Sequence, residues 1–171
     1  DEIYKLEKDN YTQNGRTFLH KTGFVTGNLI KIKQFENFIN DLHKILNNEL
    51  MKTFKLTDKK YSNYGIDPNN YLIIDDIWGV IWRRDDYNLP HTHPNYHIAG
   101  ACYIKLPKKD IENNGGKLAI SNPTKNMFPI FDKNPSNGLN IKILTPKLGK
   151  GIIFRADTEH FVLPSYTSED R

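Results

Sequence analysis

The chain has 171 residues, which fits one domain with a single hydrophobic core. Hydrophobic residues make up 37% of it and aromatic residues 12%, enough apolar surface to exclude a chain that is disordered throughout. The net charge is only +4 and the basic residues are scattered, whereas nucleic-acid-binding surfaces carry a denser basic stripe, so we do not expect nucleic acid as a partner.

Cysteine content and hydropathy indicate the compartment. The single cysteine, Cys102, cannot form a disulfide within the chain, and its apolar neighbours over 98–104 predict a buried, unreactive thiol. No apolar run reaches the length of a membrane span, and no signal peptide is visible. We therefore expect a cytoplasmic protein without a membrane partner, and the sequence indicates no oligomeric state.

In chain order, the first thirty residues mix aromatic residues with glycines and predict extended segments joined by turns. Residues 34–51 change period: apolar side chains recur at steps of three and four, which predicts an amphipathic helix that packs on a sheet. Its apolar stripe consists of Phe35, Phe38, Ile39, Leu42, Ile45, Leu46 and Leu50. Residues 52–70 are polar and rich in turn residues, which predicts a long connection.

From residue 71 onward the pattern is that of β-strands. Short segments rich in β-branched and aromatic residues alternate with turn clusters such as 85–90. The predicted strands are 71–74, 77–82, 98–106, 117–120, 141–144 and 151–154. Strands spaced in this way predict a sandwich or barrel. We therefore predict a single domain in two parts, a helical and extended part over 1–70 and a β-rich core over 71–171.

Three of the six histidines lie in one short segment, Pro90-His91-Thr92-His93-Pro94-Asn95-Tyr96-His97. In a strand, side chains two positions apart lie on the same face about 7 Å apart, so His91 and His93 can converge on one ion. His160 follows another predicted strand and is a further candidate ligand. Imidazoles suit divalent iron, zinc, copper or nickel. The alternative is that these are partly exposed loop histidines beside Pro90 and Pro94.

An ordered series of motifs extends this pattern from Trp78 to Arg171. The series is Trp78, His91-Thr92-His93-Pro94, Ala99-Gly100-Ala101-Cys102-Tyr103, Leu106-Pro107, Gly115-Gly116-Lys117-Leu118, Pro146 with Gly149, His160, Pro164 and Arg171. In this order it resembles the 2-oxoglutarate/Fe(II)-dependent oxygenases, and more narrowly a His-x-His-Pro branch of that superfamily found in marine bacteria and phages. The Gly-Gly turn is similar to one in the prolyl-hydroxylase-like enzymes.

The resemblance implies a mainly β fold, a double-stranded β-helix of jelly-roll or cupin-like type with one or two buttressing N-terminal helices. It implies a dioxygenase that hydroxylates its substrate with O2 and converts 2-oxoglutarate to succinate and CO2. Fe(II) would be bound by His91, His93 and His160. Arg171 matches the arginine that binds the distal carboxylate of 2-oxoglutarate, and Tyr103 would line the same pocket unless it is an ordinary core residue. The Gly-Gly turn favours a peptide or protein side chain as substrate.

Three further expectations concern the end of the chain, the anchor for 2-oxoglutarate and the compartment. Because the family pattern continues as a strand past its arginine, we expect the native chain to extend beyond Arg171. If Arg171 is not the anchor for 2-oxoglutarate, Lys142, Lys150 or Arg155 are the next candidates. If the protein is encoded by a phage, its compartment would be the cytoplasm of the host.

Two positions leave alternatives open. Most of the superfamily has a carboxylate where His93 stands, so His93 is either a third neutral ligand or stands aside while water or an acid completes the site. His97 shares the spacing of the other two, and we expect it to line the pocket without binding metal. If His97 does bind, the site resembles that of cupin-like metalloenzymes, which do not use 2-oxoglutarate. A non-catalytic binding or structural barrel would need neither metal nor 2-oxoglutarate.

Overall fold

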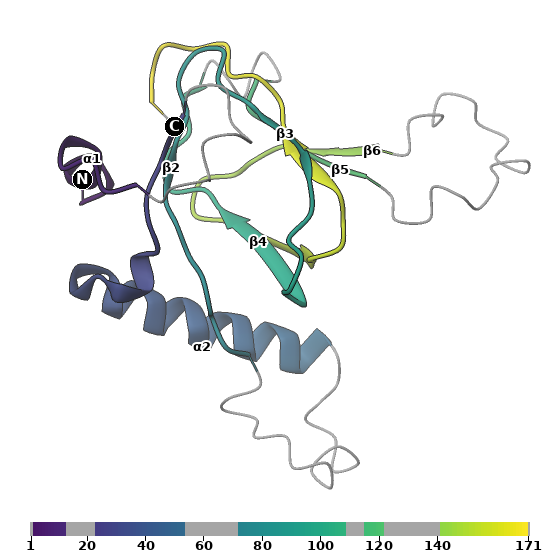
Figure 1. Ribbon diagram of the computed structural model, residues 1–171. Helices are drawn as coiled ribbons and strands as arrows, with labels where there is room; N and C mark the ends of the chain where they lie inside the picture. Colours follow the sequence, from purple (N-terminus) through teal and green to yellow (C-terminus); the bar gives the residue numbers. More distant parts are fainter. Residues whose placement is uncertain (1, 13–22, 54–71, 109–114, 122–140, 171) are drawn as a thin grey trace, which may run out of the picture. The chain divides into compact units, whose positions relative to one another are not determined.

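A computed structural model describes most of the chain, namely residues 2–12, 23–53, 72–108, 115–121 and 141–170. The described part contains two α-helices and a set of antiparallel strands (Figure 1). Neither helix is long and apolar enough to cross a membrane. The chain divides into two compact units, which we describe separately: residues 1–13 with 26–79, and residues 14–25 with 80–171.

The first unit contains both helices. Helix α2 spans Glu36–Thr53 and confirms the amphipathic helix predicted over 34–51. It begins with an acidic residue in its first turn and ends with Lys52 in its last, which suits the helix dipole. Its buried Asn47 binds Leu72 on the returning chain, because the Asn47 Oδ1 accepts a hydrogen bond from the Leu72 N–H at 2.7 Å. This hydrogen bond ties Leu72 to α2.

Helix α1 spans Glu2–Lys8 and was not predicted. The expectation of extended structure over the first thirty residues is therefore wrong at the N-terminus. The helix is short and contains no buried residue, so it has no apolar stripe long enough to reveal its period. Two single 3-10 turns, η2 (Leu29–Lys31) and η3 (Lys33–Phe35), lead into α2.

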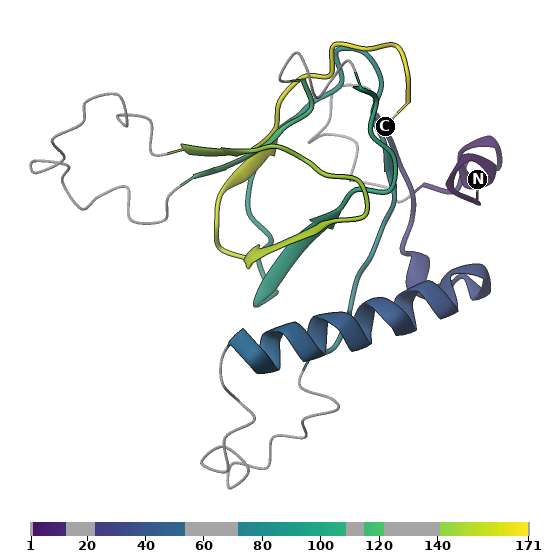
Figure 2. The ribbon, with the colours of Figure 1, turned by 180° about the vertical axis from the view of Figure 1, so that it is seen from behind.

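The described residues of the second unit form three antiparallel sheets (Figures 1 and 2). The largest has the strand order β3-β8-β5-β6, formed by Asn88–His91, His160–Val162, Leu118–Ser121 and Ile141–Leu144. Two-stranded ribbons pair β4 with β7 (Ile98–Cys102 and Gly151–Arg155) and β1 with β2 (Phe24–Val25 and Val80–Ile81). The core is thus β-rich, as predicted.

Strand register places the residues of the large sheet in rows that share one face, because side chains of directly paired residues lie on the same side. One row consists of His91, His160, Ile120 and Lys142. The next row on that face consists of Asn88, Val162, Leu118 and Leu144, with a register irregularity in β3 between the two rows. Leu118 is 2% exposed, so this face carries part of the core.

The β4–β7 ribbon has one exposed face and one half-buried face. The half-buried face carries Ala99, Ala101, Ile152 and Phe154. The other face carries Gly100, Cys102, Gly151, Ile153 and Arg155, which are exposed, and Ile98, which is half-buried at the start of β4. The prediction that Cys102 is buried is therefore wrong, because strand alternation places it on the outer face. The Phe154 ring lies 4.6 Å from the His160 ring between centroids, so the half-buried face of the ribbon is turned toward the large sheet.

The predicted strands agree with the structure best at 118–121, 141–144 and 151–155. Two other predictions were too long, since β4 ends at Cys102 and only Val80–Ile81 is a strand within 77–82. The strand predicted over 71–74 is wrong, because residues 72–74 form no strand. The turn predicted over 85–90 is wrong in its second half, where β3 begins at Asn88. The antiparallel β-rich architecture is established; the double-stranded β-helix and the domain boundary at residue 70 stay predictions.

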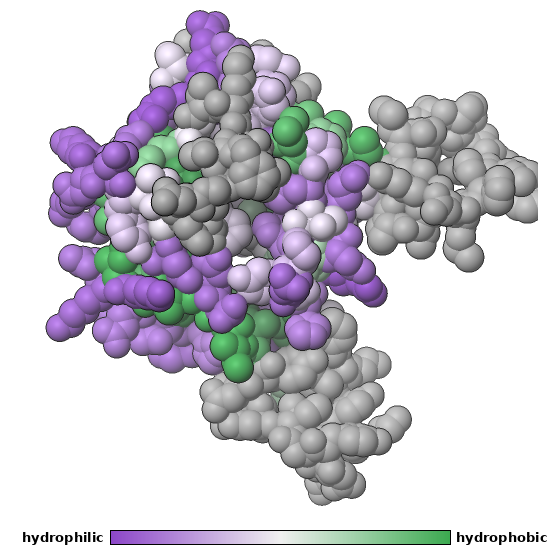
Figure 3. All heavy atoms as spheres, in the orientation of Figure 1, coloured by the Kyte–Doolittle hydropathy of each residue, from purple (hydrophilic) through white to green (hydrophobic). Residues whose placement is uncertain are grey.

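Hydrophilic residues cover most of the face seen in Figure 3, with smaller hydrophobic areas between them. Large apolar side chains that are exposed include Ile73, Ile104, Ile143 and Leu148. Single exposed apolar residues of this kind are normal on a protein surface. We assign them no partner.

Candidate metal centre

Two histidines from distant parts of the sequence face each other across one pair of strands. His91 ends β3 and His160 begins β8, and the two are direct register partners. Their ring centroids are 4.3 Å apart. Because paired residues in an antiparallel ladder share a face, the sheet alone aims both imidazoles to the same side.

His93 joins them from the loop after β3, not from the strand itself. Its ring centroid lies 5.2 Å from that of His91 and 4.9 Å from that of His160. The loop is held by its backbone: the His93 N–H donates to the Ala156 carbonyl at 2.9 Å, and the Ala156 N–H donates to the His97 carbonyl at 3.1 Å. His91 and His93 converge, as predicted. The predicted cause, alternation along one strand, is wrong: His93 lies in a loop that is held by backbone hydrogen bonds to Ala156, at the end of β7.

Backbone carbonyls orient two of the three rings. The Nδ1 of His91 lies 2.7 Å from the Leu89 carbonyl oxygen, and the Nδ1 of His160 lies 2.9 Å from that of Thr158. A carbonyl oxygen only accepts, so Nδ1 carries the proton in both rings and Nε2 presents a lone pair. Nε2 of each ring is therefore the atom available to a metal.

His160 has a lowered pKa because it is buried. Burial is the largest cause, the hydrogen bond to the Thr158 carbonyl partly opposes it, and charge on His91 lowers the pKa further. The Phe154 ring adds apolar surface beside the imidazole. His160 consequently stays neutral at lower pH than an exposed histidine does, which preserves its lone pair.

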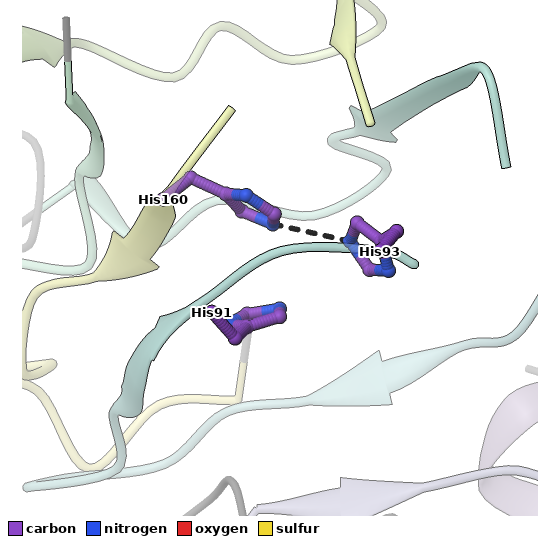
Figure 4. A group of neighbouring side chains, drawn as sticks. All are labelled: His91, His93 and His160. Atoms are coloured by element: carbon purple, nitrogen blue, oxygen red, sulfur yellow. Dashed lines mark hydrogen bonds between the residues drawn. The ribbon is translucent and has the colours of Figure 1, made fainter. Parts of the chain in front are cut away.

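The three side chains fit the requirements of one divalent ion. Their candidate ligand nitrogens all lie within 4.8 Å of one another, and His93 Nε2 and His160 Nε2 are 3.2 Å apart (Figure 4). Two nitrogens that bind one ion at about 2.1 Å are about 3.0 Å apart at a right angle and about 3.4 Å apart at a tetrahedral angle. The His93–His160 separation falls between these values, and a pair at the 4.8 Å limit would have to close by about 1.4 Å to bind the same ion.

Other residues near the triad are not part of this group. His97 is exposed and lies outside the cluster, so a four-histidine site of the cupin type is not assembled among the described residues. Asp157 pairs with Arg155 at 2.6 Å on the surface, which lowers the pKa of Asp157 and raises that of Arg155. Glu159 accepts a hydrogen bond from the Ser121 hydroxyl at 2.9 Å. Both acids thus have hydrogen-bond partners outside the histidine cluster.

Of the two residues predicted to bind 2-oxoglutarate, the structure describes Tyr103. Tyr103 follows β4 and is half-buried; its N–H donates to the Lys150 carbonyl at 3.2 Å and its carbonyl accepts from the Gly149 N–H at 2.8 Å. Strand alternation continues from Ala99 and Ala101 to Tyr103, which favours the half-buried side of the ribbon. Arg171 lies outside the described residues.

Sequence reasoning missed three features that shape the site. They are the strand β3, the two carbonyls that orient His91 and His160, and the Phe154 ring against His160. Phe154 had a detectable signal, since it alternates with exposed residues in a strand just before His160. The carbonyl contacts had none, because backbone acceptors are independent of residue type.

Comparison with known families agrees with this geometry. The family described as "Putative 2OG-Fe(II) oxygenase" matches residues 76–171, which is more than half of the chain and includes all three histidines. The chain therefore belongs to this family of 2-oxoglutarate/Fe(II) oxygenases, as the motif order indicated. No curated protein shows a significant match to the chain.

Proposed function

We propose that this protein is a 2-oxoglutarate-dependent dioxygenase that hydroxylates its substrate, with Fe(II) bound by His91, His93 and His160. The observation that carries the proposal is the convergence of three histidine nitrogens within 4.8 Å inside the segment that matches the family. Three protein ligands on one face leave the other positions of an ion open to a cosubstrate and O2. That arrangement suits an oxygenase better than a closed structural metal site.

Each histidine has a distinct part in this proposal. His91 and His160 offer Nε2 with the proton held on Nδ1 by a backbone carbonyl. In the structure the His93 Nε2 lies against that of His160, and because the latter has no proton, His93 is the donor. Metal binding would require His93 to carry its proton on Nδ1 instead. His93 also stands where most of the superfamily has a carboxylate.

The bound Fe(II) would supply the activation of O2, so that one oxygen atom enters the substrate C–H bond and the other enters succinate as 2-oxoglutarate loses CO2. The chain's own residues would bind and orient the reactants. The Phe154 ring lies against His160 and shields it from water. We propose Arg171 and Tyr103 as cosubstrate-binding residues on the strength of the resemblance.

The substrate proposal is coarser. We place the chain in the His-x-His-Pro branch of the superfamily because of the order of its motifs. We propose a peptide or protein side chain as the substrate class, because the Gly115-Gly116 turn is similar to one in prolyl-hydroxylase-like enzymes. Gly116 has φ 58°, a left-handed conformation for which glycine is the favoured residue. We propose a cytoplasmic site of action, in the host if the gene belongs to a phage.

Formation of succinate tests this function without a known substrate. Protein loaded with Fe(II) is incubated with 2-oxoglutarate and extracts of candidate peptides in air, and succinate is quantified. We expect succinate that depends on O2 and is absent in His160→Ala, while His97→Ala, an exposed histidine outside the cluster, forms it at the wild-type level. Equal succinate in wild type and His160→Ala would contradict the proposal.

A further inference from the structure

The β3–β8 pair has one extra residue on the side of β3. Asn88 pairs with Val162 and His91 pairs with His160, so three steps along β3 match two steps along β8. In a regular strand, residues three positions apart point to opposite faces of the sheet. The extra residue between Asn88 and His91 forms a β-bulge, and this bulge returns His91 to the face on which His160 lies.

The Asn88 side chain takes over a hydrogen bond of the ladder where the bulge begins. Its Oδ1 accepts from the Val162 N–H, whereas in a regular hydrogen-bonded pair the backbone carbonyl of the opposite residue is the acceptor. The next N–H of β8, that of Leu163, turns the other way and donates to the Lys117 carbonyl at 2.9 Å. Asn88 is 8% exposed and Val162 is half-buried, so losing this acceptor would leave a poorly hydrated N–H.

The two residues inside the bulge suit the orientation of the His91 ring. The Leu89 carbonyl accepts from the His91 Nδ1 at 2.7 Å, which is the contact that leaves Nε2 free of a proton. Pro90 has no N–H, so the irregular segment contains one backbone donor fewer that needs a partner. The bulge therefore sets both the face to which His91 points and the nitrogen that it offers to a metal.

We propose that Asn88 is a positioning residue of the metal centre, whose side chain holds the β3 bulge in the register that aligns His91 with His160. This inference rests on the proposed function, because it takes the triad as the metal site. Asn88 acts through the Val162 N–H and does not itself bind the ion. Without Oδ1, the Val162 N–H would recruit a backbone carbonyl of β3 instead. That shift would move the bulge and turn the His91 ring away from its partner.

A second buried asparagine provides a matched control. Asn47 is 4% exposed, and its Oδ1 also accepts a backbone N–H, that of Leu72 at 2.7 Å, but it belongs to α2 in the first unit. Loss of either side chain therefore removes the same kind of hydrogen bond, and only Asn88 is in the strand that carries His91.

The variants are Asn88→Ala, Asn88→Asp and Asn47→Ala. Asn88→Asp keeps an acceptor oxygen at the same position. Asn88→Val also removes the acceptor but favours a strand, so it replaces Asn88→Ala if that variant does not fold. Three quantities are measured: the urea midpoint, the Fe(II) dissociation constant by anaerobic competition with a chelator, and the tautomer of His91 in the metal-free protein by nitrogen-15 NMR at pH 8.

We expect both alanine variants to unfold at lower urea concentration than the wild type, because each loses a buried hydrogen bond. Only Asn88→Ala should weaken Fe(II) binding, by about tenfold, as is typical when a group that orients a metal ligand is lost. Only Asn88→Ala should replace the single Nδ1–H form of His91 with a mixture of the two tautomers. Asn88→Asp should keep that single form and bind Fe(II) at least as tightly as the wild type.

Two results would overturn the role of Asn88. One is Fe(II) binding or a His91 tautomer that is unchanged in Asn88→Ala, and the other is an equal loss of Fe(II) affinity in Asn47→Ala. Wild-type protein that binds no Fe(II) would instead overturn the proposed function. The tautomer of His91 would then still decide whether Asn88 aligns this ring, because it is measured without metal.

Discussion

His91 and His160 occupy directly opposed positions of the β3–β8 pair, with ring centroids 4.3 Å apart and each Nδ1 turned to a backbone carbonyl two residues earlier in the chain. This symmetry means that the sheet and not a flexible loop places two of the three candidate ligands. A centre built on paired strands holds its ligands in place before the metal arrives, so less ordering is needed on binding.

Loss of either strand ligand should abolish metal binding. We expect His91→Ala and His160→Ala to fall from about one Fe(II) per chain to none detectable after anaerobic loading and desalting, because two ligands no longer complete one face of the ion. Metal is quantified by atomic spectroscopy. His97→Ala is the matched control and should keep its metal, since His97 is exposed and outside the cluster. Stoichiometric iron in His160→Ala would show that the triad is not the metal site.

The unusual third ligand can be tested by restoring the commoner one. His93→Asp should retain Fe(II), because it recreates two histidines and one carboxylate, whereas His93→Ala should bind Fe(II) about 10- to 100-fold more weakly. Competition with a chelator of known affinity measures both. If His93→Ala binds iron as tightly as the wild type, His93 is not a ligand and water or another group completes the face.

The lowered pKa of His160 makes the metal-free protein sensitive to acid. In the unfolded chain this histidine titrates near its ordinary pKa of about 6.5, so the unfolded state takes up a proton at a higher pH than the folded state does. The free energy of unfolding should therefore fall as pH drops from 7.5 to 5.5, by at most about 1.4 kcal/mol per pH unit from this residue. Urea denaturation at the two pH values measures it.

Two substitutions distinguish His160 from other titrating groups in that experiment. His160→Gln should reduce the dependence of the unfolding free energy on pH, because the buried site no longer titrates. His97→Gln, at an exposed position, should leave the dependence as in the wild type. An equal pH dependence in wild type and His160→Gln would mean that burial of His160 does not govern acid sensitivity.

The β4–β7 ribbon that carries Phe154 depends on close backbone approach at Gly100. A Cβ added there would lie 2.7 Å from the Ile152 carbonyl oxygen, a backbone atom that cannot swing aside. We expect Gly100→Ala to destabilise the protein by about 1–3 kcal/mol. Gly151→Ala on the same ribbon is the control, since its Cβ would meet its nearest neighbour at 3.7 Å. Equal unfolding free energies for the two variants would refute this account of the strand pairing.

The sequence predicted those helices and strands that are long enough to show a repeat of apolar residues. Helix α2 was predicted because its apolar residues recur over eighteen residues, whereas the seven residues of α1 are too few to show a period. Strand β3 was not predicted, because Pro90 is of a residue type that is common in turns. Proline is tolerated there because β3 is at the edge of its sheet, where one side of the strand needs no ladder hydrogen bonds.

The sequence predicted which histidines form the candidate metal site, but not how strand pairing brings them together. Spacing suggested His91 and His93. His160 was a further candidate because it follows a predicted strand, and its place in the motif order selected it, since nothing local links it to the other two. The pairing of His160 with His91, and through Ile120 with Lys142, depends on strand order and register. These are long-range properties, and short periodic segments do not encode which strand lies next to which.

Anaerobic calorimetry of 2-oxoglutarate with and without Fe(II) tests the central claim most directly. We predict binding of one 2-oxoglutarate per chain that requires Fe(II) in the wild type and is lost in His160→Ala. Protein that takes up the metal but binds no 2-oxoglutarate would be a cupin-like metalloenzyme, and protein that binds neither would be a non-catalytic barrel. Either of these two results would contradict the assignment of the His91–His93–His160 centre to a 2-oxoglutarate-dependent dioxygenase.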